Sequence, residues 1–292
     1  MKKILITGAN SFIGTSLEAY LRQWPEAYQV DTVDMLDGSW RQRSFSGYDA
    51  VFHVAGIAHS DTGKVSEARK ALYYQVNRDL TVETAKKAKA DGVGQFVFMS
   101  SAIVYGDSAP IGKQKMITRE TPVSPSNFYG DSKVQAEQGI LPLAEEGFKV
   151  VILRPPMIYG AGCKGNFVML SKVAEKLPVF PAVKNQRSVL YIENLTEFVR
   201  LMIDNGESGI FWPQNREYAN TSELVAMIGA AHGKKILLVK GFAWALKILS
   251  CVTGLVNKAF GSLCYDPDMS VYREEYRLVD LEASIAATEK KV

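Results

Sequence analysis

The sequence is poor in cysteine and histidine, and neither residue type is arranged for a disulfide framework or a metal site. The 292 residues include three cysteines, Cys163, Cys251 and Cys264, and three widely separated histidines. Disulfide-rich domains carry an even, closely spaced set of cysteines, and zinc sites carry pairs of ligands at short intervals. We therefore expect a protein of a reducing compartment with no metal site.

A strong charge of one sign is also missing. Lys and Arg number 34 and Asp and Glu number 31, which leaves a formal net charge of +3. The basic residues are scattered, whereas nucleic-acid binding needs them clustered. The N-terminus lacks the basic region, long apolar run and small-residue cleavage site of a secretory signal peptide. We therefore expect a cytoplasmic protein that binds no nucleic acid.

Apolar residues are present in the amount that a full core requires. They make up 47% of the chain. A chain of this length has room for one large α/β unit or for two closely joined lobes. The sequence contains no internal repeat and no low-complexity linker.

The N-terminal stretch from Lys3 to Thr15 predicts a strand, a tight turn and a helix. Residues 4–6 are a short apolar run typical of a buried strand, and apolar residues recur with helical spacing from position 13 onward. Gly8 allows a sharp turn, and Gly14 allows the helix to approach the strand closely. Such a turn points backbone N–H groups and the positive end of a helix dipole at a pyrophosphate. A plain structural turn is the alternative.

An acidic residue follows the next predicted strand. Residues 28–33 indicate this strand, and Asp34 lies just past its end. An acid at this place accepts hydrogen bonds from the adenosine ribose and repels a 2′-phosphate, which favours NAD over NADP. Two alternatives stay open: Asp34 only solvates the strand end, or Arg41 and Arg43 fold back onto a 2′-phosphate.

Residues 48–56 predict a third buried strand. It ends in small residues, including Ala55, which leave room for a flat cofactor. His53 and His59 invite a catalytic interpretation. Because His53 lies within the apolar run, we expect it to be a core histidine with satisfied hydrogen bonds.

A helix is predicted over residues 71–90. Val82, Ala85 and Ala88 would face inward because their spacing is helical. Asn77 lies in the same helix, as either an anchor for neighbouring backbone or a surface residue.

Hydroxyl, phenol and ammonium groups follow the fourth predicted strand. Residues 95–101 form this strand and end in Ser100 and Ser101, at the sheet edge where ligands gather. Tyr129 and Lys133 stand four apart in a helix, so both side chains lie on one face. A lysine ammonium and a positive nicotinamide ring together lower a tyrosine pKa that is ordinarily about 10. Tyr129 can then act as a general base or acid at neutral pH.

Taken in this order, these segments resemble the extended short-chain dehydrogenase/reductase superfamily, in its NAD-dependent sugar-nucleotide epimerase/dehydratase branch. The resemblance covers roughly the first 195 residues and fades toward the C-terminus. It implies an α/β fold with a doubly wound parallel sheet (Rossmann fold) and a smaller C-terminal substrate lobe. The matching segments are Thr7–Ala9, Phe12–Gly14, Phe52–Ala55, Val76–Asn77, Ser100–Gly106, Thr121–Pro122, Tyr129–Lys133 and Leu153–Gly160.

The resemblance implies a catalytic set of Ser101, Tyr129 and Lys133. In this set Ser101 orients the substrate oxygen, Tyr129 moves the proton, and Lys133 binds the nicotinamide ribose and tunes the tyrosine. The resemblance also implies that the residues binding NAD are Gly8, Asn10, Ser11, Phe12, Ile13, Gly14, Asp34, Ala55, Lys133 and Pro156.

Two positions depart from the family pattern. Ser11 stands where the family usually has its middle glycine, so its hydroxyl can donate to a phosphate while its Cβ crowds one. Family dehydratases carry Thr-Asp-Glu where this chain has Ser101-Ala102-Ile103. Without that acid pair, elimination of water lacks its proton carriers, and dehydration is disfavoured.

The resemblance places substrate contacts in the second half of the chain. Asn166 and Arg187 match family residues that hold the nucleotide diphosphate, and Ser101 contacts the sugar. The alternatives are that Asn166 caps the next helix and that Arg187 makes a surface ion pair. Cys163 is expected to be a bystander because no basic residue lies beside it.

Residues 242–255 are strongly apolar apart from Lys247. The stretch is too short and too interrupted to span a membrane. It predicts either a core or partner-contacting helix or a weak contact with a membrane surface.

These observations predict a dinucleotide-binding domain over residues 1–160, with 188–208 returning to it, and a substrate-binding lobe over 161–292. The predicted activity is NAD-dependent epimerisation of a nucleotide-diphosphate hexose through a 4-keto intermediate, similar to that of a UDP-glucose 4-epimerase. One alternative is an NAD(P)H-dependent 4-ketoreductase of a nucleotide-linked deoxy sugar in surface-polysaccharide synthesis. Another is a non-catalytic dinucleotide-binding sensor. We also expect a homodimer.

Overall fold

The computed structural model describes residues 1–57, 65–242 and 254–290. The chain forms two compact units. The first unit contains residues 1–106, 123–155 and 195–213, and the second contains residues 107–122, 156–194 and 214–292.

These bounds differ from the expected division at residue 160. Residues 107–122 belong to the second unit, because strand β5 (Met116–Ile117) pairs with strand β12 (Cys264–Tyr265). The stretch that returns to the first unit is 195–213 rather than 188–208.

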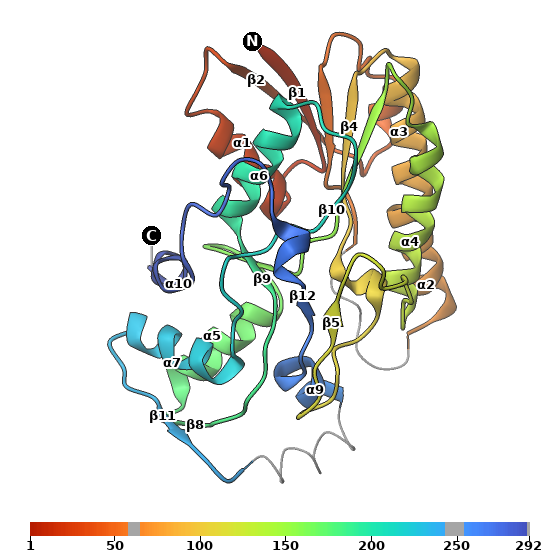
Figure 1. The fold of residues 1–292 in the computed structure, drawn as a ribbon. Helices are drawn as coiled ribbons and strands as arrows, with labels where there is room; N and C mark the ends of the chain where they lie inside the picture. Colours follow the sequence, from red (N-terminus) through yellow and green to blue (C-terminus); the bar gives the residue numbers. More distant parts are fainter. Residues whose placement is uncertain (58–64, 243–253, 291–292) are drawn as a thin grey trace. The chain divides into compact units, whose positions relative to one another are not determined.

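A six-stranded sheet forms the centre of the first unit (Figure 1). Its order is β10-β6-β4-β3-β1-β2, and every neighbouring pair is parallel. The predicted α/β fold with a doubly wound parallel sheet is therefore confirmed. The strands are β1 (Lys2–Thr7), β2 (Tyr28–Val33), β3 (Ala50–His53), β4 (Gln95–Met99), β6 (Lys149–Leu153) and β10 (Gly209–Phe211).

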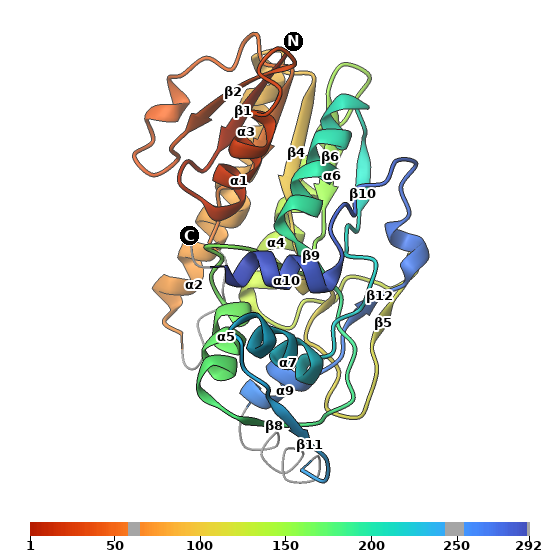
Figure 2. The same ribbon diagram turned by 90° about the vertical axis from the view of Figure 1, so that its left-hand side faces the viewer.

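Helices cover both faces of this sheet. Helices α1 (Phe12–Leu21) and α6 (Ile192–Asp204) lie on one face (Figures 1 and 2). The opposite face carries α2 (Glu67–Tyr73), α3 (Leu80–Ala90) and α4 (Phe128–Ile140). The central strands are consequently buried on both faces, which explains their continuous apolar runs.

The winding of the chain reverses between β1 and β3. The chain passes from β1 outward to β2 and then crosses back to β3 on the other side of β1. Ligands of such folds bind outside the carboxyl ends of the strands at this reversal. The residues that follow β1 and β3 are therefore the expected ligand-binding residues.

The predicted helix over residues 71–90 contains a π-helix that the sequence pattern did not reveal. Residues Tyr74–Asp79 adopt this wider helix between α2 and α3. Asn77 lies inside it and is fully buried, so the interpretation of Asn77 as an anchor is the correct one. π-Helical turns are frequent at functional sites.

His53 is a core residue, as expected. Its Nδ1 atom lies 2.7 Å from the Thr7 hydroxyl, and its Nε2 atom lies 3.0 Å from the Thr81 hydroxyl. Because the Thr81 hydroxyl donates its only hydrogen to the Asn77 carbonyl, it must accept from Nε2–H. His53 is therefore a neutral ring with its proton on Nε2, and it joins β1, β3 and α3.

The second unit combines short parallel strand pairs with helices. The pairs are β12-β5, β11-β8 and β7-β9. Tyr159 lies in its core, where its ring stacks on Phe167 at 5.0 Å and its hydroxyl bonds the side chains of Ser284 and Asn215. Further elements of this unit are β7 (Met157–Tyr159), α5 (Asn166–Lys176), β8 (Val179–Pro181), β9 (Val189–Tyr191), α7 (Thr221–Ala231), β11 (Leu237–Val239), α9 (Gly254–Phe260) and α10 (Leu281–Glu289).

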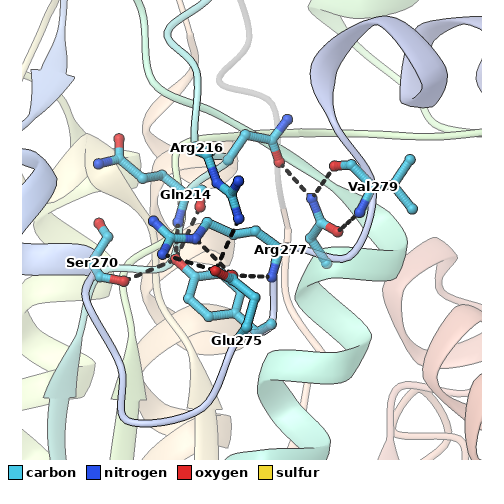
Figure 3. A network of polar contacts seen from close by, with 9 residues as sticks. Gln214, Arg216, Ser270, Glu275, Arg277 and Val279 are labelled. Atoms are coloured by element: carbon cyan, nitrogen blue, oxygen red, sulfur yellow. Dashed lines mark hydrogen bonds and ion pairs between the residues drawn. The ribbon is translucent and has the colours of Figure 1, made fainter.

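Side chains hold the irregular segment that precedes α10. Figure 3 shows Glu275 between two arginines: its carboxylate lies 3.0 Å from Arg216 and 2.9 Å from Arg277. The Tyr276 hydroxyl donates to the Gln214 carbonyl at 2.9 Å and accepts from the Gln214 N–H at 3.1 Å. These side-chain contacts take the place of the backbone hydrogen bonds that would hold a paired strand.

Some residues named in the sequence analysis fall outside the described ranges. His59 and Cys251 are not described, and neither are residues 243–253 of the apolar stretch 242–255. No helix within the described ranges has the length and apolar character needed to cross a membrane.

We expect His53 to make the stability of the protein depend on pH. Burial, assisted by the charge of Lys133, lowers the pKa of His53 from 6.5 to about 3. Between pH 3 and pH 6.5, His53 binds a proton in the unfolded chain but not in the folded chain. The free energy of unfolding therefore falls as the pH is lowered, by at most about 1.4 kcal/mol per pH unit.

Urea unfolding midpoints, measured at several pH values below 6.5, check this expectation. The variant His53→Gln keeps a donor and an acceptor but cannot titrate, so its midpoint should depend less on pH. An equally steep dependence in both proteins would contradict the role assigned to His53.

Candidate active site

The turn after β1 has the geometry of a phosphate-binding loop. Gly8 has φ +94° and Asn10 has φ +65°, so both lie in the left-handed region. A Cβ atom added to Gly8 would lie 2.8 Å from the Ala55 nitrogen. Glycine is therefore required both by the turn and by its close approach to the end of β3.

Ser11 begins α1 as its N-cap. Its hydroxyl accepts a hydrogen bond from the Gly14 N–H at 3.1 Å, and a Cβ atom at Gly14 would lie 2.6 Å from that hydroxyl oxygen. Helical geometry leaves the N–H groups of Phe12 and Ile13 without an acceptor inside the helix. These donors and the helix dipole fit a pyrophosphate, and the Ser11 hydroxyl still has its hydrogen to donate. The departure from the middle glycine is thus compatible with the predicted cofactor.

Asp34 follows β2, as expected, and lies in a tight local turn. One carboxylate oxygen accepts from the Leu36 N–H at 2.9 Å. Arg41 is paired with Glu83 through two contacts of 2.5 and 2.6 Å. Arg43 donates to the Thr32 carbonyl at 3.0 Å and to the Tyr48 hydroxyl at 2.9 Å. Both arginines are thus engaged by the protein itself.

The loop after β3 is held by Asn77. The Asn77 side chain accepts from the Ile57 N–H at 2.8 Å, donates to the Ile57 carbonyl at 3.1 Å, and donates to the Ser132 hydroxyl at 3.1 Å. A Cβ atom at Gly56 would lie 3.0 Å from the Asn77 amide oxygen and 3.4 Å from the Lys133 ammonium. Asn77 therefore ties this loop to α4 beside Lys133.

Ser101 and Tyr129 meet at the carboxyl edge of the sheet. Ser101 follows β4 and caps the short helix Ala102–Tyr105, while Tyr129 lies in the first turn of α4. The Ser101 hydroxyl acts on the Tyr129 phenol, whose pKa it lowers against the effect of burial, and Tyr129 is half-buried. The sequence pattern predicted that both would lie at this edge, and the structure brings them together.

Lys133 lies one turn farther along α4 and is buried, with 6% exposure. Its ammonium donates to the Met99 carbonyl at 2.9 Å and lies 4.7 Å from the centre of the Phe98 ring. Burial lowers the pKa of Lys133 to about 8, and the charge of Glu137 opposes this shift.

The chain's own residues do not lower the pKa of Tyr129. Burial raises it to about 12, with a smaller contribution from Tyr73, while the Ser101 hydrogen bond opposes the shift. The expected lowering, which invoked the ammonium and the nicotinamide together, does not occur in the protein chain alone. A phenolate at neutral pH requires the second charge that the expectation invoked, that of the nicotinamide.

The sequence profile of a known family covers most of the first unit. The NAD dependent epimerase/dehydratase family matches residues 4–212. The chain belongs to this family. Membership in a family of NAD-dependent epimerases and dehydratases supports an enzyme and agrees with the nucleotide-binding character of the glycine turn.

Relatives in this family include sugar-nucleotide epimerases. The chain is 29% identical over 289 residues to a UDP-glucose 4-epimerase of Vibrio cholerae, covering 91% of this chain and 87% of that protein. It is 28% identical over 254 residues to the N-acetyl-alpha-D-glucosaminyl-diphospho-ditrans,octacis-undecaprenol 4-epimerase of Escherichia coli O157:H7, covering 80% and 73%.

A solved structure shows the same fold. UDP-glucuronic acid 4-epimerase of Bacillus cereus, in complex with NAD, superposes with a TM-score of 0.74. The comparison covers 98% of this chain and 97% of that chain at 18% identity.

The remaining predicted ligand residues belong to the second unit. Pro156 follows β6 and is half-buried. Asn166 is exposed at the start of α5, where Gly165 occupies the cap position without a side-chain hydrogen bond, so the interpretation of Asn166 as a cap is wrong. Burial lowers the pKa of Arg187, whose guanidinium donates to the Ala259 carbonyl at 3.2 Å.

Cys163 is a buried free cysteine. Burial raises the pKa of the Cys163 thiol, which disfavours a thiolate nucleophile. Within residues 1–57, 65–242 and 254–290, no three potential metal ligands gather at one place.

A buried polar network beneath the site was not predicted. It joins Ser100, Glu137 and Arg154, together with Tyr105 and Trp212. The one available signal was Glu137, which stands four residues after Lys133 and therefore on the same helix face as Tyr129 and Lys133.

We expect Gly8→Ala to abolish or strongly weaken NAD binding. The added methyl group must adopt a left-handed backbone and would press on the Ala55 backbone. Gly92→Ala is the matched control, because Gly92 also has a positive φ of +79° but has nothing within 4 Å of its added Cβ. Each substitution should cost about 1 kcal/mol of stability through backbone strain.

Isothermal calorimetry with NAD separates the two variants. The Gly92 variant should bind NAD as the unchanged protein does, and the Gly8 variant at least tenfold more weakly. Equal NAD affinity in the two variants would contradict a role of the Gly8 turn in cofactor binding.

Proposed function

We propose that the protein epimerises a nucleotide-diphosphate hexose at C4 through a 4-keto intermediate. The observation that carries this proposal is the placement of Ser101, Tyr129 and Lys133 at the carboxyl edge of the sheet. Ser101 acts on the phenol of Tyr129, and Lys133 lies one helical turn farther along α4, in the same unit as the glycine turn. These are the groups that alcohol oxidation needs: a proton acceptor, an orienting hydroxyl and a cation.

In the proposed reaction, Tyr129 as phenolate takes the proton of the C4 hydroxyl while Ser101 holds the same oxygen by a hydrogen bond. NAD supplies the acceptor for the C4 hydride and the donor that returns it. Tyr129 gives its proton back when the keto sugar is reduced on its other face, so the reaction consumes no net cofactor. The positive charge of Lys133 stabilises the phenolate throughout.

The proposed cofactor is NAD rather than NADP. Asp34 directly follows β2, and a carboxylate there would repel a 2′-phosphate, which disfavours NADP. Arg41 and Arg43, the two nearby cations, are held by Glu83, Thr32 and Tyr48. Tighter binding of NADP than of NAD would contradict this preference.

The proposed contacts of the nucleotide diphosphate are Asn166 and Arg187. Burial lowers the pKa of Arg187, so a bound anion would stabilise its charged form. Asn166 is exposed and able to donate its amide to a phosphate oxygen.

A lipid-linked diphosphate sugar is a second candidate substrate class. The Escherichia coli relative is named for an undecaprenol-linked sugar. In the second unit, Val179 and Leu237 are register partners in β8 and β11, so both side chains lie on one face, where they are 49% and 60% exposed. The neighbouring Phe242 is also exposed, and lysines flank the strands, which suits contact with an anionic membrane surface.

The function is tested by incubating purified protein, without added cofactor, with UDP- and dTDP-hexoses and with a polyprenyl-diphosphate-linked N-acetylhexosamine. NMR of the products should show the C4 epimer of one of these compounds. Turnover of only a 4-keto sugar with added NAD(P)H would favour the 4-ketoreductase alternative. Cofactor binding without any turnover would favour the non-catalytic sensor.

We expect Tyr129→Phe to retain NAD binding and to lower kcat by about 1,000-fold, because the variant keeps the ring but loses the proton carrier, whose contribution is typically 10²–10⁴-fold. The measurement is turnover of the identified substrate, with NAD affinity by calorimetry as the control. Undiminished turnover would remove Tyr129 from the mechanism.

A further inference from the structure

Helix α4 carries a buried carboxylate that the proposed reaction does not use. Glu137 is 3% exposed and lies four residues after Lys133. A carboxylate so far from water is costly unless it is paired and hydrogen-bonded. Its contacts therefore identify what it holds in place.

The carboxylate is held by a guanidinium fork. Arg154, 8% exposed, donates from Nε to Glu137 Oε1 at 3.1 Å and from Nη2 to Oε2 at 2.5 Å. Its third nitrogen donates to the Tyr105 hydroxyl at 2.7 Å, and Trp212 Nε1 donates to the same hydroxyl at 2.8 Å. The fork fixes the direction of the Glu137 carboxylate.

The same carboxylate accepts a hydrogen bond from the Ser100 hydroxyl. Ser100 immediately precedes Ser101, and its backbone N–H donates to the Leu153 carbonyl at 2.8 Å. The end of β4 is therefore held by β6 on one side and by α4 on the other.

Three successive turns of α4 thus contact three successive residues at the end of β4. Tyr129 interacts with Ser101, Lys133 donates a hydrogen bond to the Met99 carbonyl, and Glu137 accepts one from the Ser100 hydroxyl. Glu137 also forms an ion pair with Arg154, which anchors its contact with Ser100.

We propose that Glu137 is a positioning residue for the reaction: with Arg154, it fixes Ser100 and thereby the alignment of Ser101 with Tyr129 and Lys133. The inference rests on the proposed function of those three residues. It adds a role for a group that touches neither substrate nor cofactor.

The charges around Glu137 give it a second effect on the site. Its neighbours include Lys133 on its own helix, Arg154 after β6 and Tyr105 after β4, and His53 of β3 faces Lys133. Glu137 raises the pKa of Lys133 against the effect of burial. Loss of its charge therefore moves the deprotonation of Lys133 to lower pH, and the phenolate of Tyr129 loses support.

The test compares Glu137→Gln with Glu197→Gln. Glu197 is also buried and also forms a fork with an arginine, Arg200, at two distances of 2.7 Å, but it lies on α6. We expect Glu137→Gln to lower kcat by about 100-fold with KM for the sugar and NAD affinity unchanged, because small misplacements of catalytic groups cost about this factor. Its alkaline limb in the pH profile should move to lower pH, whereas Glu197→Gln should keep the kcat and the profile of the unchanged protein.

Two further variants keep the proposal testable where Glu137→Gln folds poorly. Ser100→Ala removes one hydroxyl and leaves the ion pair, and it should lower kcat in the same direction. Glu137→Asp keeps the charge and should recover part of the activity and the original pH profile. A kcat per folded molecule equal to that of the unchanged protein in Ser100→Ala and in a folded Glu137 variant would overturn the proposal, because a merely structural role changes only stability.

A measurement without substrate separates this inference from the proposed function. The phenolate of Tyr129 is followed by ultraviolet difference absorbance against Tyr129→Phe, with NAD present. In Glu137→Gln it should form at higher pH than in the unchanged protein, even where no sugar of the panel is turned over. If the Tyr129 phenolate formed at the same pH in Glu137→Gln as in the unchanged protein, the positioning role of Glu137 would be contradicted. If no sugar substrate were turned over, only the proposed function would be contradicted.

Discussion

A lysine ammonium buried at the end of a parallel sheet is the interaction on which the rest of the site depends. Desolvation disfavours the charge of Lys133, and a carbonyl, an aromatic ring and a nearby carboxylate stabilise it. In the proposed reaction this charge, together with that of the nicotinamide, stabilises the phenolate of Tyr129. Any change that lets water reach this ammonium, or that removes its neighbours, alters both groups together.

The parts of the fold that follow from local patterns could be predicted from the sequence. Short apolar runs bounded by glycine or acidic residues marked strands such as β1 and β3 correctly, because a strand buried on both faces must be apolar throughout. The order of strands, glycine turn and Tyr-Lys helix then pointed to one family, and the family comparison agrees.

What could not be predicted depends on contacts between distant segments. The π-helix around Asn77 has no signature in hydrophobic periodicity, since it is stabilised by the Ile57 backbone and Ser132. The assignment of residues 107–122 to the second unit depends on the pairing of β5 with β12, two strands of two residues each. The pKa of Tyr129 also followed from burial and not from the spacing of Tyr129 and Lys133. The ligand roles of Asn166, Arg187 and Pro156, the division of labour between the units and the homodimer stay predictions.

The wide turn at Tyr74–Asp79 constrains how this chain can evolve. A π-helix accommodates one more residue than the regular helix that flanks it. Removing a single residue there would restore regular winding while the flanking helices α2 and α3 keep their orientation. The widened turn that contains Asn77 would be lost, and with it the position from which its amide bonds Ile57 and Ser132, so a one-residue deletion that a surface loop tolerates would here remove a support of the site.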